Sequence, residues 1–422
     1  MKSKSLSQID PEIEELIKKE LYRQQDTLML IPSENYASPA VLEAQSSVFN
    51  NKYAEGYISK RYYQGCRWVD EVERIAIQRA KELFGAEHVN VQAHSGTGAN
   101  IACYHALLQP HDKILSLDLS QGGHISHGKK GSLPFSFYKI VHYGVNRRTE
   151  QFDFEEIRGI AKRERPRLIV VGASSYPRKV DFKPWREIAD EVGAYLMADM
   201  AHIIGLIAGG VHPDPVPYAD VVTATTQKTL RGPRGGLIIC KREIAEKIDR
   251  SVFPGTQGGP FIHIIAAKAV CFKEAMQPSF KEYAKQIVSN SRHLAEVLIE
   301  EGFRLVTGGT DNHLILIDLS SKNLTGKQAA LLLEEAGIVV NKNCIPFDPL
   351  PPSITSGIRL GTPALTTRGM KEKEMELIGR WIGEILNNPH NEVIRSRIRS
   401  QVKDLCQSFP IYKDYQAGYH NF

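Results

Sequence analysis

The sequence predicts an α/β protein in which a largely parallel sheet is followed by a smaller α+β domain. Over the first two thirds of the chain, short strand-like apolar runs alternate with stretches that have a helical period. Several of these runs are almost continuously apolar, as parallel strands are when both of their faces are covered. From about residue 281 the pattern changes to a long helix and a mixture of strands and helices, which indicates a second domain.

In the first part we expect a helix over residues 70–84, with Gly85 as its stop and one apolar face, and a second helix over residues 99–108. The face of the first helix consists of Val72, Ile75, Ala76, Ala80, Leu83 and Phe84. Strands are predicted at residues 88–93, 113–119, 167–174, 194–201, 220–226 and 235–240.

In the second part, helices are predicted at 281–301 and at 326–336, the latter with Thr325 as N-cap, and one more helix follows at 370–386. Residues 313–319 form a strand and 343–357, rich in Pro and Ser, a loop. Residues 1–50 contain one helix and little further pattern. The predicted organisation is an N-terminal arm (1–50), a large domain (51–280) and a small C-terminal domain (281–422).

Size and composition are those of a globular protein. The 422 residues are 42% hydrophobic and 24% charged, which excludes a disordered, collagen-like or coiled-coil chain. The formal charge of 53 − 48 = +5 comes without a dense Lys/Arg block, so we expect no nucleic-acid partner. The apolar runs are shorter than the ~18 residues of a membrane span, and the N-terminus turns acidic where a signal peptide is apolar. Six scattered cysteines without a CxxC pair indicate free thiols, and we expect a cytoplasmic protein without a membrane partner.

Four groups of polar residues lie at or after the ends of predicted strands, where open α/β sheets bind their ligands. Residues 94–99 carry hydroxyls and glycines at a helix start, which suits either a phosphate or an ordinary strand–helix turn. Asp199 ends an apolar strand, as a helix cap or as a functional carboxylate. Lys228 follows a buried strand beside two arginines, where burial and neighbouring cations lower an amine's pKa. Arg359, inside an apolar run, suits the capture of a carboxylate.

Together these groups suggest pyridoxal phosphate. A lysine holds the aldehyde as a Schiff base, and a carboxylate keeps the pyridine nitrogen protonated, so that the ring draws electrons from the substrate. A distal arginine fixes the substrate's carboxylate and thereby selects the bond that breaks at the α-carbon. Residues 94–99 would bind the phosphate and are called the phosphate cradle below. Asp199, Lys228 and Arg359 supply the carboxylate, the lysine and the distal arginine.

At these residues the sequence closely resembles the serine hydroxymethyltransferase family. The resemblance runs from Ser33 to Tyr412 and includes long strings in the family's order, among them NKYAEGY (51–57), HSGTGAN (94–100), QGGHISHG (121–128), ADMAHIIGL (198–206), KTLRGPRGG (228–236) and TSGIRLGTPA (355–364). It implies a fold-type-I pyridoxal phosphate transferase with a mostly parallel seven-stranded sheet. The implied reaction transfers the hydroxymethyl group of L-serine reversibly to tetrahydrofolate, giving glycine and 5,10-methylenetetrahydrofolate through an external aldimine and a quinonoid.

The resemblance also implies residue roles and a homodimer, or a tetramer, with shared active sites. The implied catalytic residues are Lys228, Glu55, His124, Asp199 and Tyr63. The implied cofactor-binding residues are Ser95, Gly96, Thr97, His124, Ser174, Asp199, His202, Thr225, Lys228, Arg234, Tyr53 and Gly258, of which Tyr53 and Gly258, like Glu55, come from the neighbouring subunit. Ser33, Tyr63, His202 and Arg359 bind the substrate. The folate residues are Glu55, Tyr62, Leu119, Gly123, His124, Ile125, Asn343, Pro351, Pro352 and Ser353.

Two alternatives remain open. The family has His before the Schiff-base lysine, whereas this chain has Gln227, which carries no charge. That difference leaves room for an α-methylserine hydroxymethyltransferase or a folate-independent threonine aldolase or transaldolase of the same fold, and, from another class, an inactive scaffold homologue. His124 and His127 have i, i+3 spacing, but we expect no metal there because no carboxylate or cysteine framework is evident nearby.

Overall fold

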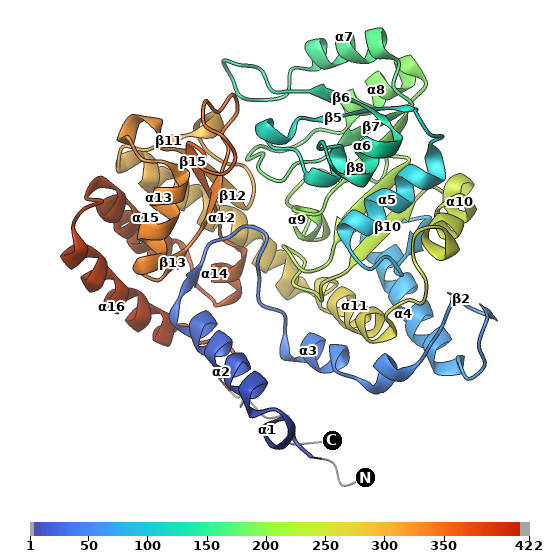
Figure 1. The fold of residues 1–422 in the computed structure, drawn as a ribbon, viewed down its shortest axis with the longest axis horizontal. Coiled ribbons are helices and arrows are strands. Elements are labelled where there is room, and N and C mark those ends of the chain that lie inside the picture. The colour runs from blue at the N-terminus through green and yellow to red at the C-terminus, as the bar shows by residue number, and fades with distance from the viewer. Residues whose placement is uncertain (1–3, 414–422) are drawn as a thin grey trace.

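The larger of two main sheets has seven strands. In the computed structural model, which describes residues 4–413, their order is β4-β10-β9-β8-β7-β5-β6 (Figure 1). The strands are β4 (His88–Asn90), β5 (Lys113–Leu117), β6 (Lys139–Tyr143), β7 (Leu168–Val171), β8 (Tyr195–Asp199), β9 (Val221–Thr225) and β10 (Gly236–Cys240). Only β10 runs antiparallel to its neighbours β4 and β9 within this sheet. The predicted mostly parallel seven-stranded sheet is confirmed.

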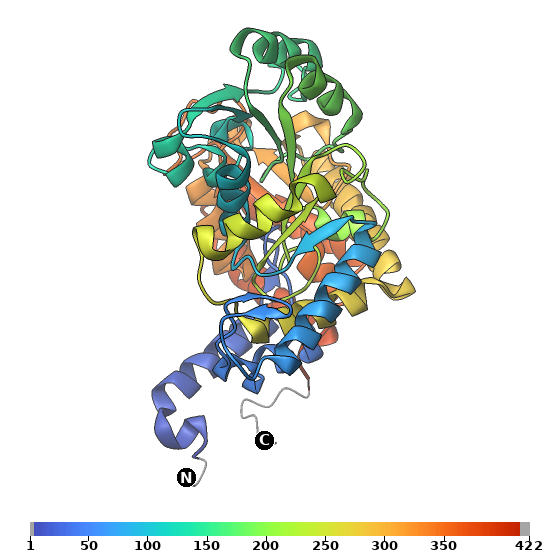
Figure 2. The same cartoon turned by 90° about the vertical axis from the view of Figure 1, so that its right-hand side faces the viewer.

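Helices cover both faces of this sheet because its strands are apolar on both sides (Figures 1 and 2). In β7, Leu168 and Val170 pack into one buried cluster, and the alternate residues Ile169 and Val171 pack into another. The first cluster includes side chains of α5 (Gly96–Leu107) and α10 (Ala245–Arg250). The second includes α4 (Arg67–Phe84), α7 (Phe154–Glu164), α8 (Lys183–Val192), α9 (Ile204–Ala208) and α11 (Ile262–Ala275).

Most predicted strands exist but are shorter. The apolar face predicted for the helix over residues 70–84 was partly wrong. On α4, which ends at Gly85 as predicted, Ile75 is 40% exposed instead of packed. Glu73 takes a core position, where its carboxylate is paired with the guanidinium of Arg61. A carboxylate is buried there only because the partner, twelve residues earlier, compensates for the lost water.

The second sheet has four antiparallel strands in the order β11-β12-β15-β14. They are β11 (Arg304–Leu305), β12 (Leu314–Asp318), β15 (Gly357–Gly361) and β14 (Asn341–Asn343), and they pack with α12 (Pro278–Glu300), α13 (Gly326–Glu335), α14 (Pro363–Thr367) and α15 (Glu372–Asn387). Thr325 caps α13 as predicted. The expectation of a single last helix was wrong, because α16 (Glu392–Ser408) follows α15 and buries Ile398, Val402 and Cys406.

The N-terminal segment lies against the small sheet's side of the molecule (Figure 1). After α1 (Leu6–Ile9) and α2 (Pro11–Asp26), β1 (Leu28–Met29) pairs in parallel with β13 (Ile338–Val339). The buried guanidinium of Arg368 donates to carbonyls at the end of α2 and of α16, which ties this segment to the C-terminal part. α3 (Pro39–Gln45) packs on α11 instead.

The proposed domain boundaries stay a proposal. α12 crosses the boundary at 281, since its first half, with Phe280 and Ile287, belongs to the core of the large sheet and its second half, with Leu294 and Leu298, to the other core. Residues 1–3 and 414–422 of the proposed arm and small domain lie outside the described residues. All six cysteines are free, five of them buried and Cys344 half-buried. Within residues 4–413, no helix has both the length and the apolar character needed to cross a bilayer.

Candidate active site

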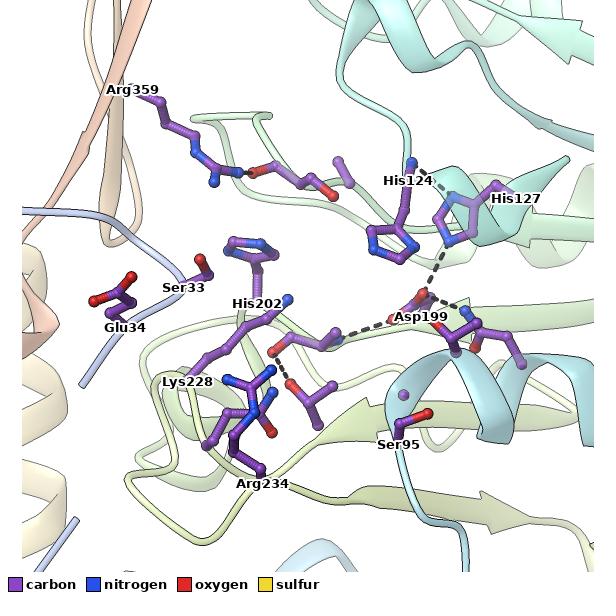
Figure 3. A pocket seen from close by; sticks show the side chains of 18 residues that line it. Ser33, Glu34, Ser95, His124, His127, Asp199, His202, Lys228, Arg234 and Arg359 are labelled. Carbon is purple, nitrogen blue, oxygen red and sulfur yellow. Dashed lines mark hydrogen bonds and ion pairs between the residues drawn. The ribbon is translucent and has the colours of Figure 1, made fainter. Parts of the chain in front are cut away.

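A cavity of about 510 Å³ lies where the ends of β8 and β9 face the small sheet (Figure 3). It brings together twelve of the predicted site residues from distant parts of the chain, namely Ser33, Ser95, Gly96, Thr97, His124, Ser174, Asp199, His202, Thr225, Lys228, Arg234 and Arg359. In Figure 3, Arg359 and Ser33 lie on one side, Asp199 and two histidines on the other, and Lys228 and His202 between them. Sequence segments that are far apart therefore form one site.

The predicted phosphate cradle is the N-terminus of α5. The Ser95 hydroxyl caps this twelve-residue helix by accepting from the backbone N–H of Gly98 at 3.0 Å. At Gly96 a Cβ would lie 2.4 Å from Cγ2 of Thr225, so only glycine lets the turn pack against β9. Free backbone N–H groups and the positive end of the helix dipole thus face the cavity, an arrangement that favours an anion.

Asp199, the last residue of β8, is held by donors on three sides. Its carboxylate accepts from Nε2 of His127 (2.8 Å), Nδ2 of Asn100 (2.7 Å) and the backbone N–H of Ala201 (3.1 Å). Burial alone would raise the pKa of Asp199, but the hydrogen bonds from His127 and Asn100 and the nearby histidines hold it well below its usual value. The group is therefore a buried carboxylate that is charged at neutral pH.

His127 and Asn100, which donate to Asp199, were not predicted from the sequence as site residues. His127 Nδ1 accepts from the backbone N–H of His124 (3.3 Å), so its proton lies on Nε2 and points at Asp199. The Asn100 amide also donates to Ser126 Oγ (2.9 Å) and accepts from Thr223 Oγ1 (2.6 Å). A signal existed for both, because Asn100 lies one helical turn after Gly96 and His127 three residues after His124.

The expected lack of a carboxylate near His124 and His127 was wrong, because Asp199 lies beside both. One ligand atom each from His124, His127 and Asp199 fall within 4.8 Å of one another. Asp199 is already occupied by His127 Nε2 and by two other donors. The absence of a metal therefore stays a prediction.

His124 presents a neutral ring to the cavity. Its Nδ1 accepts from the backbone N–H of Ser126 (3.2 Å), and burial lowers the pKa of His124 to about 4. A flat, uncharged imidazole beside Asp199 suits stacking on an electron-poor aromatic ring, where a cation would be repelled. His202 is likewise kept neutral, since burial and the nearby Lys228 and Arg359 cations lower its pKa well below the usual value.

Lys228, three residues after β9, is a buried amine with an unusually low pKa. Burial is the main cause of the low pKa. The Asp199 carboxylate raises the pKa of Lys228 and the cations of Arg359 and Arg234 lower it, so that it falls to about 8. Near neutral pH a far larger fraction of this amine is unprotonated than of an ordinary lysine. The preceding Gln227 also lines the cavity, and its Oε1 accepts from the backbone N–H of Gly235 at 3.4 Å.

Arg359 enters the cavity from β15 of the small sheet. Its guanidinium donates to the Ser174 carbonyl and, through Nε, to Asn341 Oδ1 at 3.2 Å. These contacts use two of the five N–H groups and leave donors for a carboxylate ligand. Beside it, His202 Nδ1 lies 3.3 Å from Nε2 of the buried His313, so residues of both sheets meet at this end of the cavity.

A second cluster of predicted residues does not line this cavity. Tyr53, Glu55 and Tyr63 belong to the hairpin of β2 (Gly56–Tyr57) and β3 (Lys60–Arg61) and its flanks. The rings of Tyr53 and Tyr63 are 5.2 Å apart, and a Cβ at Gly258 would lie 3.3 Å from Oε1 of Glu55. These four residues are close to one another but apart from Lys228 in the same chain, and Tyr62 contacts Phe253 nearby.

The remaining predicted folate residues are also absent from the lining of the cavity, and their role stays a prediction. They are Leu119, Gly123, Ile125, Asn343, Pro351, Pro352 and Ser353. Gly123 and Ile125 flank His124 in sequence, whereas Pro351–Ser353 lie in the exposed loop between β14 and β15. Glu34, Ala173 and Ala201 line the cavity without having been predicted.

Comparisons with known proteins find a matching family model and similar relatives. The family model described as serine hydroxymethyltransferase matches residues 6–382. A protein of Myxococcus xanthus named serine hydroxymethyltransferase is 56% identical over 409 residues, which cover 97% of this chain and 98% of the relative. A protein of Koribacter versatilis with the same name is 56% identical over 415 residues, covering 98% of this chain and 97% of the relative.

Proposed function

Because the chain belongs to the serine hydroxymethyltransferase family, we propose that it transfers the hydroxymethyl group of L-serine reversibly to tetrahydrofolate. The products are glycine and 5,10-methylenetetrahydrofolate. One observation carries the proposal: Lys228, Asp199, Arg359 and the cradle of α5 converge on one cavity. A cytoplasmic location stays a prediction from the sequence.

The residues present fit pyridoxal phosphate. The cradle offers backbone N–H groups where a Cβ at Gly96 would clash, a donor set suited to a phosphate. The charged Asp199 suits a protonated pyridine nitrogen, and Lys228 suits an aldehyde. When bound, pyridoxal phosphate supplies an electron-withdrawing ring that takes up the electrons of the bond broken at the substrate's α-carbon.

The chain's own groups then divide the remaining work. Lys228, with its lowered pKa, would offer a neutral amine that condenses with an aldehyde with loss of water, and it would accept or return a proton near neutrality. Arg359 binds the carboxylate of serine and fixes the orientation of its α-carbon. His124 would offer its neutral ring for stacking on the cofactor ring, and the charged Asp199 would favour a protonated ring nitrogen.

The assay that tests this proposal measures glycine formed from L-serine with and without tetrahydrofolate. We expect glycine formation to depend on tetrahydrofolate and to yield methylenetetrahydrofolate in equal amount. Lys228→Ala serves as the matched control for background. Glycine released at the same rate without folate would contradict the proposal and would favour the aldolase alternative that Gln227 leaves open.

We further propose that Tyr53, Glu55, Tyr63 and Gly258 complete the site of a second copy of the chain. Large side chains in and around their hairpin are exposed in the single chain, namely Val48, Tyr53, Tyr62, Tyr63 and Trp68. Exposed aromatic side chains of this kind are typical of interfaces. A symmetric dimer would bring each hairpin to its partner's cavity.

Mixed dimers test this arrangement. Glu55→Gln and Lys228→Ala are each expected to be nearly inactive, but one site of their heterodimer combines an intact Lys228 with an intact Glu55. Random reassociation of equal amounts makes half of the dimers mixed, so we expect about one quarter of the wild-type rate. Activity no higher than that of the parent variants would contradict the shared site and would indicate that Glu55 and Lys228 of one chain serve the same site.

A further inference from the structure

A buried lysine outside the cavity lies directly behind the cradle. Lys268, on α11, is only 1% exposed. Its ammonium group donates to the carbonyl oxygens of Val91 (2.7 Å), Ala93 (3.1 Å) and Gly236 (2.7 Å). These three bonds use all three of its protons, and every acceptor is a neutral backbone carbonyl.

The three carbonyls belong to the two backbone segments that support the cradle. Val91 and Ala93 lie between the end of β4 and Ser95, the N-cap of α5. Gly236 begins β10, and its N–H donates to the Ala93 carbonyl at 2.9 Å. A Cβ at Gly236 would lie 2.3 Å from the Ser95 carbonyl oxygen, so the two segments are in direct contact. Lys268 therefore joins them immediately before the turn that faces the cavity.

We propose that the Lys268 ammonium is an internal cation that fixes the strand-to-helix turn of the cofactor-phosphate cradle. Lys268 is thus a positioning residue, and this inference rests on the proposed function. Without the side chain, three converging carbonyls would repel one another and form a vacant oxygen cage of the kind that binds a small monovalent cation. Burial lowers the pKa of Lys268 to about 7, and the Glu73 carboxylate opposes this shift.

The test compares cofactor affinity in Lys268→Ala, Lys268→Met and wild-type apoenzyme by titration with pyridoxal phosphate. We expect both variants to bind at least about 10-fold more weakly, the effect of losing charge-assisted hydrogen bonds. Ammonium or methylammonium ions should restore much of the affinity of Lys268→Ala, where space is open, but not of Lys268→Met, where the thioether fills it. Tetramethylammonium at equal ionic strength should restore neither. Lys241→Met, at the other end of β10, is the matched control and should bind like wild type.

Unchanged cofactor affinity in folded Lys268→Met, or equal responses of Lys268→Ala to ammonium and tetramethylammonium, would overturn the inference. If Lys268→Ala folds poorly in sodium buffer, its yield of folded protein with ammonium replaces affinity as the readout, and a yield independent of ammonium would equally overturn it. Failure of the wild-type protein to bind pyridoxal phosphate would instead refute the proposed function.

Discussion

Replacement of Lys228 by alanine is expected to lower the turnover of L-serine by on the order of 10³-fold or more. The variant loses the only amine that the described cavity places between Asp199 and Arg359, and with it both covalent capture of the cofactor and a proton carrier. The fold should persist, because burial disfavours the charge of Lys228, and the lost attraction to Asp199 is offset by relief of the repulsion from Arg359 and Arg234.

Steady-state assays and thermal unfolding of apoenzyme together check this expectation. Lys241→Ala, which removes a lysine bound to Asp220 outside the cavity, is the matched control and should retain wild-type turnover. A Lys228→Ala variant that keeps its fold and more than about a tenth of the wild-type rate would contradict the role of this amine.

Replacement of Asp199 by asparagine is expected to lower kcat/KM by about 10²- to 10⁴-fold. Asparagine has nearly the same shape but no charge with which to hold a proton on the cofactor's ring nitrogen. It also meets donors on His127, Asn100 and Ala201 with only one acceptor oxygen, which leaves buried donors unpaired. Asp199→Glu, which keeps the charge, should retain more activity than Asp199→Asn, and the reverse order would contradict the electrostatic role.

Ionisation of Asp199 should also make the unfolding free energy of the apoenzyme depend on pH. The pKa of Asp199 is lower in the folded than in the unfolded chain, where it is near 4, so ionised Asp199 stabilises the fold above that value. This contribution is lost as the pH falls toward the folded pKa. The difference in unfolding free energy between wild type and Asp199→Asn should therefore be constant near neutrality and shrink below about pH 4.

The sequence predicts most of the large sheet because its strands are apolar throughout and are bounded by turns. β6 was not predicted, since Lys139 and His142 interrupt an edge strand that is buried only at its end. α16 was also missed, although Ile398, Val402 and Cys406 recur every four residues along its buried face. Arg-rich intervening positions masked that spacing.

Long-range pairing explains what local patterns could not supply. From the sequence alone Glu73 would be assigned to the surface, and only the structure shows that it pairs with Arg61. Asn100 would likewise be taken for an ordinary polar position of a helix, whereas it is hydrogen-bonded to Asp199 and Thr223. In contrast, Asp199 and Lys228 were recognisable because the first ends a buried strand and the second follows one, and such strand ends meet at one edge of the sheet. The hairpin residues Tyr53 and Glu55 came from the family resemblance alone.

The most direct test of the central claim is borohydride reduction of the enzyme loaded with pyridoxal phosphate, followed by peptide mass spectrometry. A stable pyridoxyl group on Lys228, absent from Lys228→Ala treated in the same way, is the predicted result. A label on another lysine, or none at all on a folded protein that has bound the cofactor, would contradict it.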